Sequence, residues 1–271
     1  MMRKIGVLTS GGDAPGMNAA VMSIARSAAA YGMPLIGIKH GYNGLLRKST
    51  SIKDDLQELY LDTVLDIADQ PGTYLRTARC EEFKDPKWRE IAVQTLKAME
   101  IDGLVVIGGD GSFQGAMRLC ELGIPCIGIP GTIDNDLAYT EMTLGYETAV
   151  QVCTEAIRAI RATSRSHDRP HVVECMGRHC GDIALKAACA TGSEIVVVPE
   201  VPWSVEEVAS RLNKQIAKGN YRSTIVLAEG CWESMAPFDM YGFLTSHGKQ
   251  CFEGEPMSAM RFASITRHCK G

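Results

Sequence analysis

Short apolar runs alternate with amphipathic stretches along the first 229 residues of this 271-residue chain. The apolar runs predict buried strands at residues 4–9, 33–38, 103–107, 124–129, 172–175, 195–198 and 224–228. The stretches between them predict helices at residues 17–31, 87–99, 113–122, 146–163, 182–190 and 205–218. Strands that alternate with helices in this way indicate an α/β fold with parallel sheets and right-handed crossovers.

The pattern breaks at two places, which sets the predicted domain organisation. A polar gap at residues 137–142 separates two α/β sets, so we expect domains at residues 1–138 and 139–229. Residues 230–271 lack sustained periodicity of either kind and are expected to form a divergent tail of uncertain structure.

The strand predicted at residues 124–129 leads into a polar turn, GIPGTIDND at residues 128–136. Pro130 ends the ladder, and Gly131 lets the backbone approach a ligand closely. Asp134 and Asp136 then offer a general base with a second carboxylate beside it. Ligands of open α/β sheets lie beyond the carboxyl ends of the strands. The same residues also suit an ordinary surface turn, and the motif alone leaves both interpretations open.

Two other predicted strands end in glycine-rich turns that open helices. The first turn is SGGDAP, residues 10–15, and the second is GGDGS, residues 108–112. Glycines at a helix N-terminus present backbone N–H groups to an anion, and Asp110 is placed to hold a magnesium ion. The alternative is a tight turn without a ligand. Arg76 and Arg79 follow on a Gly- and Thr-bearing loop, where arginines clamp phosphate or remain solvated.

Composition excludes several classes of protein. The net charge is −4 and the basic residues are scattered, which argues against nucleic acid as a partner. The ten cysteines form no CxxC pair, so we expect reduced structural thiols, no zinc site and a cytoplasmic location. No signal peptide is visible, and no stretch reaches the ~18 apolar residues of a membrane span.

Together, the motifs KIGVLTSGGDAPGMNAA, VVIGGDGS, GIPGTIDND, VVECMGRHCGD and IVVVPEVPWS closely resemble the bacterial ATP-dependent 6-phosphofructokinases over residues 1–229. The resemblance implies two doubly wound, mainly parallel-sheet domains with the active site in the cleft between them. The implied reaction is a glycolytic phosphotransfer, which moves the γ-phosphoryl group of ATP to the 1-hydroxyl of fructose 6-phosphate. The family also implies a magnesium cofactor, a homotetramer and an allosteric effector, ADP or phosphoenolpyruvate.

The resemblance assigns the nucleotide to residues of the first domain and the sugar phosphate to residues of both. The ATP-binding positions are Gly12, Arg79, Cys80, Gly109, Asp110, Gly111 and Ser112, with Asp110 in the magnesium position. The substrate-binding positions are Thr132, Ile133, Asp134, Arg169, Met176, Gly177, Arg178 and Glu229. Asp134 matches the catalytic base, and Thr132 and Arg178 the other catalytic positions. Arg169 resembles an arginine that reaches into the site of a neighbouring subunit.

Effector binding is matched only in part. The matching residues are Arg26, Arg161, Gly192, Ser193, Glu194 and Lys218. Met22 stands where the family typically has an effector-binding arginine.

Beyond Glu229 the chain departs from the family, which continues with an arginine and a GHIQRGG-like turn. His247 lies in an unrelated context, SHGK. We therefore expect a truncated C-terminus, an incomplete sugar-phosphate site and tighter binding of ATP than of fructose 6-phosphate. Two alternatives remain, a non-catalytic nucleotide-binding subunit or remnant and another GGDG-type kinase that acts on NAD or a lipid.

Overall fold

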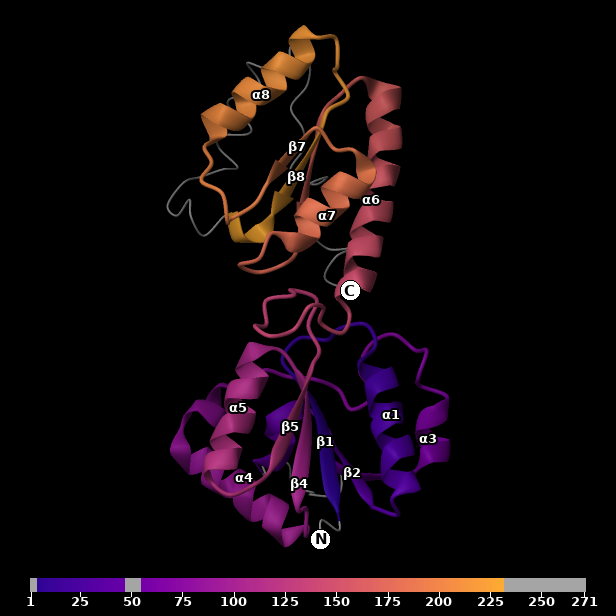
Figure 1. Ribbon diagram of the computed structural model, residues 1–271, viewed down its shortest axis with the longest axis vertical. Helices are drawn as coiled ribbons and strands as arrows, with labels where there is room; N and C mark the ends of the chain where they lie inside the picture. Colours follow the sequence, from indigo (N-terminus) through magenta and orange to yellow (C-terminus); the bar gives the residue numbers. More distant parts are fainter. Residues whose placement is uncertain (1–3, 47–54, 232–271) are drawn as a thin grey trace. The chain divides into compact units, whose positions relative to one another are not determined.

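A computed structural model describes residues 4–46 and 55–231 of the chain. The chain divides into two compact units, Met1–Glu147 and Thr148–Gly271 (Figure 1). Both units are α/β and their sheets are mainly parallel, as the sequence predicts.

The first unit is built on a five-stranded sheet in the order β3-β2-β1-β4-β5. Its parallel strands are β1 (Ile5–Ser10), β2 (Leu35–Ile38), β4 (Gly103–Gly108) and β5 (Cys126–Pro130), and β3 (Leu56–Leu59) runs antiparallel to β2. The strand order reverses between β1 and β4, because β1 pairs with β2 on one side and with β4 on the other. Such a reversal is where open α/β sheets bind their ligands.

Helices cover both faces of this sheet. They are α1 (Met17–Ala30), α3 (Leu61–Leu65), α4 (Pro86–Ala98) and α5 (Asp110–Glu121), with short 3₁₀ turns η1 (Gly41–Leu45) and η2 (Glu81–Lys84). Figure 1 shows α1 and α3 on one side of the strands and α4 and α5 on the other. Successive strand residues point to opposite faces, so Val7 packs into the core with α1 and Leu8 into the core with α4 and α5.

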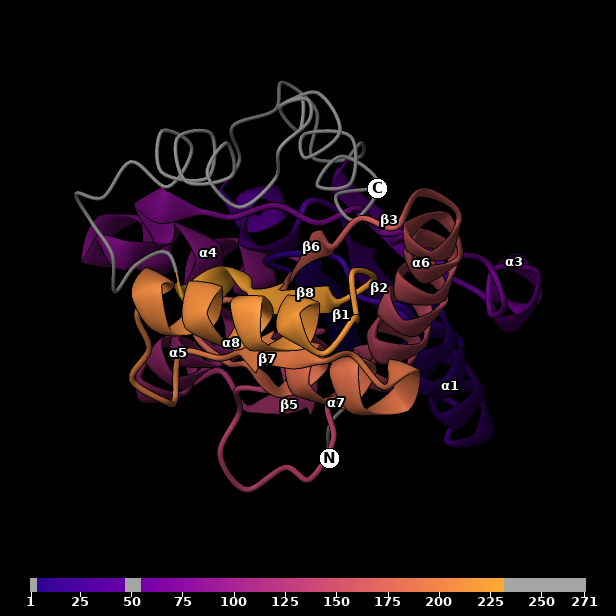
Figure 2. The same ribbon diagram turned by 90° about the horizontal axis from the view of Figure 1, so that it is seen from above.

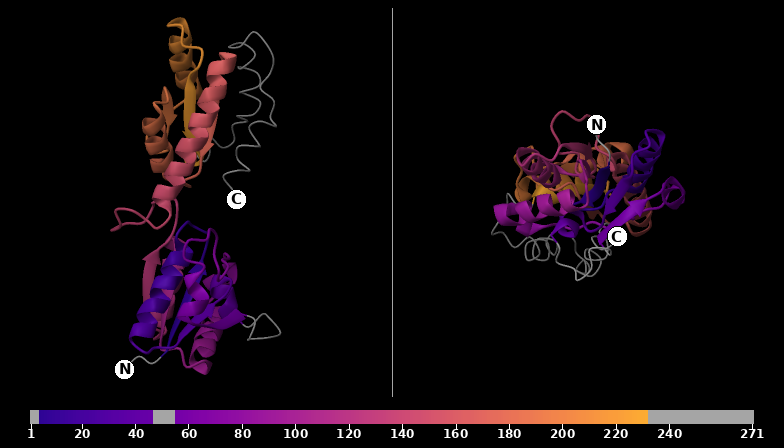
Figure 3. Two further views of the ribbon diagram at one scale, coloured as in Figure 1. Left: turned by 90° about the vertical axis from the view of Figure 1, so that its right-hand side faces the viewer. Right: turned by 90° about the horizontal axis from the view of Figure 1, so that it is seen from below.

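The second unit has a three-stranded parallel sheet among the described residues, in the order β6-β8-β7. Its strands are β6 (His171–Cys175), β7 (Ile195–Val197) and β8 (Thr224–Ala228), and its helices are α6 (Tyr146–His167), α7 (Asp182–Thr191) and α8 (Val205–Ala217). Figure 2 shows these three helices around the strands, and Figure 3 shows the length of α6. Gly192 ends α7 in the left-handed conformation, at φ 63°.

Three local expectations differ from the structure. The strand predicted at residues 124–129 is parallel but lies at the edge of the described sheet, where Ile127 is 68% exposed, rather than in its interior. Strand β3 was not predicted, because its sequence LQEL mixes apolar and charged residues. Helix α6 continues four residues past the predicted end at residue 163, and the Ser164 hydroxyl donates to the Ile160 carbonyl.

Two other sequence-based expectations concern the described residues. Every cysteine in the described part of the chain is a free thiol, as predicted. None of the described helices is both long and apolar enough to cross a membrane.

Candidate active site

The carboxyl ends of β1, β4 and β5 bring the three predicted turns of the first unit to one edge of its sheet. These strands are adjacent and parallel, and Ser10 and Pro130 both pair with Gly108 in the ladder. The Gly131 N–H donates to the Gly108 carbonyl at 3.0 Å, which joins the PGTIDND turn to the GGDGS turn. Three motifs separated by up to 120 residues therefore share one site.

The GGDGS turn forms the N-terminus of α5. Ser112 is buried and its hydroxyl donates to the Ser10 carbonyl at 3.1 Å, which fixes this turn against the SGGDAP turn. A Cβ added at Gly12 or Gly111 would meet no heavy atom within 4 Å, so both glycines border open space. Backbone N–H groups at a helix N-terminus beside open space form a binding site for phosphate.

The loop that carries Arg79 and Cys80 is tied to the same edge. The Thr77 hydroxyl donates to the Gly11 carbonyl at 2.9 Å, and the Gly11 N–H donates to the Ala78 carbonyl at 3.4 Å. The Arg79 side chain is exposed. Arg79 is therefore placed next to the glycine turns, where its guanidinium can reach a bound phosphate.

Asp134 lies on a turn that its own neighbours hold in place. Its N–H donates to the Thr132 hydroxyl at 3.2 Å, and the Thr143 hydroxyl donates to the Thr132 carbonyl at 2.6 Å. Asn135 takes a left-handed conformation at φ 53°, and its side-chain oxygen accepts from the Thr143 N–H at 3.0 Å. Thr132, Ile133 and Asp134 thus project from a fixed backbone beyond β5.

Asp110 is the acidic residue of the GGDGS turn. It is exposed in the first turn of α5, and one carboxylate oxygen accepts from the Gln114 side chain at 2.7 Å. Within the described residues no group of three or more His, Cys, Asp or Glu side chains is arranged to hold a metal ion. A single carboxylate beside a phosphate turn fits magnesium, which proteins bind through one or two carboxylates together with substrate phosphates.

In the second unit, the ends of β6 and β8 bring Met176, Gly177 and Arg178 to Glu229. One Glu229 oxygen accepts from the Gly177 N–H at 3.1 Å and from the Arg178 N–H at 2.5 Å. Arg178 has a φ of 54°, a left-handed conformation that is unfavourable for a residue with a Cβ. The Glu229 carboxylate therefore stabilises the backbone that presents the Arg178 guanidinium.

Arg169 lies apart from Arg178 and Glu229. It precedes β6, whereas the other two residues follow β6 and β8. The five residues of β6 separate the two ends by about 16 Å, at about 3.3 Å per residue. Within one chain, the backbones of these residues do not meet at one site.

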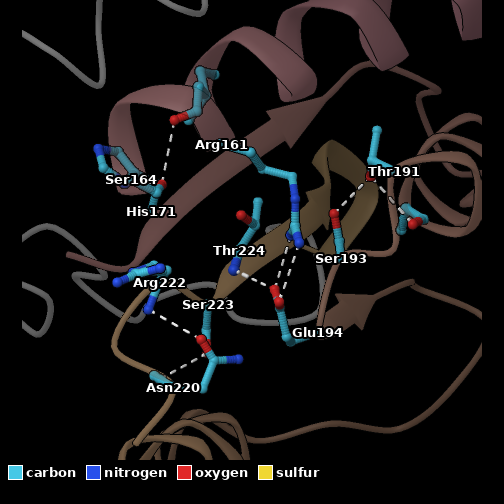
Figure 4. A network of polar contacts seen from close by, with 12 residues as sticks. Arg161, Ser164, His171, Thr191, Ser193, Glu194, Asn220, Arg222, Ser223 and Thr224 are labelled. Atoms are coloured by element: carbon cyan, nitrogen blue, oxygen red, sulfur yellow. Dashed lines mark hydrogen bonds and ion pairs between the residues drawn. The ribbon is translucent and has the colours of Figure 1, made fainter. Parts of the chain in front are cut away.

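Two predicted effector residues of the second unit, Arg161 and Glu194, meet at the same edge as Arg169. The Arg161 guanidinium donates two hydrogen bonds to the Glu194 carboxylate, at 2.9 and 3.2 Å, and Glu194 also accepts from the Thr224 N–H at 2.7 Å (Figure 4). Burial alone would raise the pKa of Glu194, but these donors hold it below its usual value. A cavity of about 190 Å³ there is lined by Arg161, Arg165, Glu194, Asn220 and Arg222.

The other predicted effector residues differ in how close they lie to this cavity. Ser193 donates to or accepts from the Thr191 hydroxyl at 2.8 Å, next to Glu194, and Gly192 is the capping residue of α7 (Figure 4). Lys218 ends α8 and does not line the cavity. Arg26 lies on α1 of the first unit, so the second unit alone does not bring it to this cluster.

Sequence reasoning missed two residues that support the site. The buried Tyr42 stacks on Phe83 and donates its hydroxyl to the Ser112 carbonyl at 2.6 Å. Burial, and then the neighbouring thiols, raise the pKa of Tyr42, so the hydroxyl stays a donor. Glu200 accepts from the Gly181 N–H at 2.7 Å, at the other end of the Arg178 loop. Their only sequence signal is a position just beyond a predicted strand.

Comparison with known proteins gives consistent results. Residues 4–263 match the family model described as Phosphofructokinase, beyond the 229 residues that carry the motifs. The ATP-dependent 6-phosphofructokinase of Clostridioides difficile (strain 630) is 56% identical over 229 residues, which cover 84% of this chain and 70% of the relative. The enzyme of the same name from Alkaliphilus metalliredigens is 51% identical over the same shares of the two chains.

Solved structures agree with this result. Pichia pastoris phosphofructokinase in the T-state superposes with a TM-score of 0.78 and 35% identity, over 85% of this chain and 26% of that one. The fold, the motifs at its strand ends and the relatives lead to one conclusion: this chain belongs to the phosphofructokinase family.

Proposed function

We propose that this protein catalyses the ATP-dependent phosphorylation of fructose 6-phosphate to fructose 1,6-bisphosphate, the phosphofructokinase step of glycolysis. The observation that carries the proposal is the meeting of the GGDGS, SGGDAP and PGTIDND turns at one sheet edge. This edge combines phosphate-binding N–H groups with a carboxylate on a fixed turn. Relatives that are 56% and 51% identical bear the corresponding name.

In the proposed mechanism, Asp134 accepts the proton of the sugar 1-hydroxyl. The hydroxyl oxygen then forms a bond to the γ-phosphorus of ATP, and the bond from that phosphorus to the bridging oxygen breaks, which releases ADP. The backbone N–H groups of Gly109 and Gly111 hold the phosphates in line, while the Ser112 N–H closes the turn on the Gly109 carbonyl. Arg178 neutralises the charge that develops on the transferred group. Phosphoryl transfer depends mainly on such positioning and charge stabilisation.

The proposed cofactor is Mg²⁺, with Asp110 as its protein ligand. When bound, magnesium neutralises phosphate oxygens during the transfer. Arg79 and Cys80 are proposed to contact ATP beside Gly12. Thr132, Ile133, Met176, Gly177 and Glu229 are proposed to contact the sugar phosphate.

We further propose a homotetramer in the cytosol. Arg169 and Arg178 lie at opposite ends of strand β6, which favours the use of Arg169 at the site of another copy. Free thiols throughout the described part of the chain fit a reducing compartment. The cluster of Arg161, Gly192, Ser193 and Glu194, with Lys218 and Arg26, is proposed to bind a phosphorylated effector such as ADP or phosphoenolpyruvate.

A coupled assay for fructose 1,6-bisphosphate on the purified protein tests the reaction. We expect product formation that requires both ATP and magnesium. ATP binding without product would instead support a non-catalytic nucleotide-binding protein, and phosphorylation of NAD or a lipid would support a different kinase.

A further inference from the structure

The segment between α6 and β6 fixes the backbone of Arg169 while its side chain stays exposed. The Arg169 N–H donates to the Ser164 carbonyl at 3.4 Å, in the last turn of α6. On the other side of Arg169, the Nδ1 atom of His171 lies 3.1 Å from the Arg169 carbonyl oxygen. Both peptide groups that flank the Arg169 Cα are therefore held.

His171 also contacts a buried hydroxyl. Its Nδ1 atom lies 2.6 Å from the Oγ atom of Ser164, which is 0% exposed (Figure 4). The Ser164 hydroxyl lies 3.3 Å from the Ile160 carbonyl. Ser164 and His171 thus connect the end of α6 to the start of β6, and Arg169 lies between them in the chain.

These distances assign the proton on the imidazole. A carbonyl oxygen only accepts, so the contact to Arg169 requires a proton on Nδ1. The same Nδ1–H can be shared with the Ser164 oxygen, provided that the Ser164 hydroxyl donates elsewhere. The Ile160 carbonyl is the acceptor for that hydroxyl. One assignment therefore satisfies all three contacts, with Nδ1–H as a shared donor and the Ser164 hydroxyl directed along α6.

Another contact at this segment is weaker. Arg222 pairs with Asp168 at 2.6 Å, but the two side chains are 55% and 62% exposed. Exposed ion pairs contribute little to holding a backbone, whereas the contact of His171 with Ser164 is shielded from water by the burial of Ser164. The contacts of His171 therefore determine the Arg169 backbone more strongly than the ion pair does.

We propose that His171, supported by Ser164, is a positioning residue that presents Arg169 to the phosphate group of the sugar substrate. The imidazole does not touch the substrate; it acts through the Arg169 carbonyl. This inference rests on the proposed role of Arg169 in binding fructose 6-phosphate.

The test compares His171→Leu, which removes the donor, with His171→Asn, whose side-chain NH₂ can replace Nδ1–H. His167→Leu, at the exposed end of α6, is the matched control, and Arg169→Ala measures the full contribution of the arginine. We expect His171→Leu to raise the KM for fructose 6-phosphate about 10-fold, since misplacement by about 1 Å costs up to about 100-fold. The kcat and the KM for ATP should stay unchanged, and His171→Asn should restore most of the loss.

Amide hydrogen exchange of Arg169 gives a readout that does not depend on activity. We expect its exchange to accelerate in His171→Leu but not in His171→Asn or His167→Leu. The proposal would be overturned if exchange of the Arg169 amide were unchanged in His171→Leu. It would also be overturned if Arg169→Ala raised the KM for fructose 6-phosphate and His171→Leu did not. Equal losses of kcat and both KM values with a lower Tm would also overturn it. If Arg169→Ala itself left the KM unchanged, the role of Arg169 would fail, and the exchange rates would still decide whether His171 positions its backbone.

Discussion

Single residues at the sheet edge of the first unit carry the proposed chemistry. Asp134 is anchored through its N–H on the Thr132 hydroxyl, a hydrogen bond that Asp134→Asn keeps. We expect Asp134→Asn to lower kcat by about 10²–10⁴-fold, the usual contribution of a positioned acid or base. Steady-state kinetics measures this loss, and calorimetry should show unchanged ATP affinity, because the base acts on the sugar hydroxyl.

Glu141→Gln provides the control, since Glu141 is an exposed carboxylate of the same loop and has no part in the proposed site. It should leave kcat close to that of the wild-type protein. A loss of ATP binding in Asp134→Asn with kcat retained would reverse the assigned roles.

We expect Gly111 to determine which phosphoryl donor fits. A Cβ there meets nothing within 4 Å, so Gly111→Asp and Gly111→Asn should both fold. The Asp carboxylate would face the phosphates of ATP and repel them, whereas the Asn amide would not. We expect Gly111→Asp to bind ATP at least about 10-fold more weakly than Gly111→Asn, a difference of about 1.4 kcal/mol. The wild-type protein should turn over faster with ATP than with pyrophosphate; the opposite preference would contradict this account.

At the scale of elements, the sequence predicts what depends on local pattern. The strands of the parallel sheets appear where apolar runs stand, because such runs suit strands covered on both faces. The edge position of β5 was not predictable, since Ile127 looks the same in an edge strand as in a central one. Likewise, the glycines and carboxylates of the site can be recognised in the sequence from their residue types. Tyr42 cannot, because its partner Ser112 lies 70 residues further along the chain.

Glu194 joins three elements of the second unit, since it bonds Arg161 of α6 and Thr224 of β8 from a position just before β7. Its folded-state pKa is lowered, so its contribution to stability is present above the usual value of 4.5. That contribution is lost as the pH falls through the lowered folded-state pKa. Glu194→Gln should therefore cost about 1.5–3 kcal/mol near neutral pH, the range for hydrogen bonds to charged groups.

Urea unfolding from pH 7 to pH 3 measures this effect. The difference in free energy of unfolding between wild type and Glu194→Gln should shrink below pH 4.5, which separates Glu194 from the other carboxylates. A difference that stays constant with pH would show that the Glu194 charge contributes nothing to stability.

At the scale of the whole molecule, the two substrates draw on different parts of the chain. The proposed nucleotide residues all lie in the first unit, whereas the proposed sugar-phosphate residues include Arg169, Arg178 and Glu229 of the second. We expect sugar-phosphate contacts to be lost after Glu229. Most of the residues concerned, 232–271, lie outside the described part of the chain, so this expectation stays a prediction. The two ligands should therefore respond differently to substitutions.

Calorimetric titration of ATP and of fructose 6-phosphate into the same preparation measures this separation. Asp110→Asn should weaken the binding of Mg·ATP, and Arg169→Ala should leave it unchanged. Arg169→Ala should weaken fructose 6-phosphate by about 10- to 100-fold, because a charge-assisted phosphate contact contributes about 1.5–3 kcal/mol. The wild-type chain should bind ATP more tightly than fructose 6-phosphate, since each sugar-phosphate contact that we expect to be lost after Glu229 would have a similar cost. Micromolar affinity for fructose 6-phosphate would show instead that residues beyond Glu229 complete the sugar-phosphate site by contacts that the family motifs do not reveal.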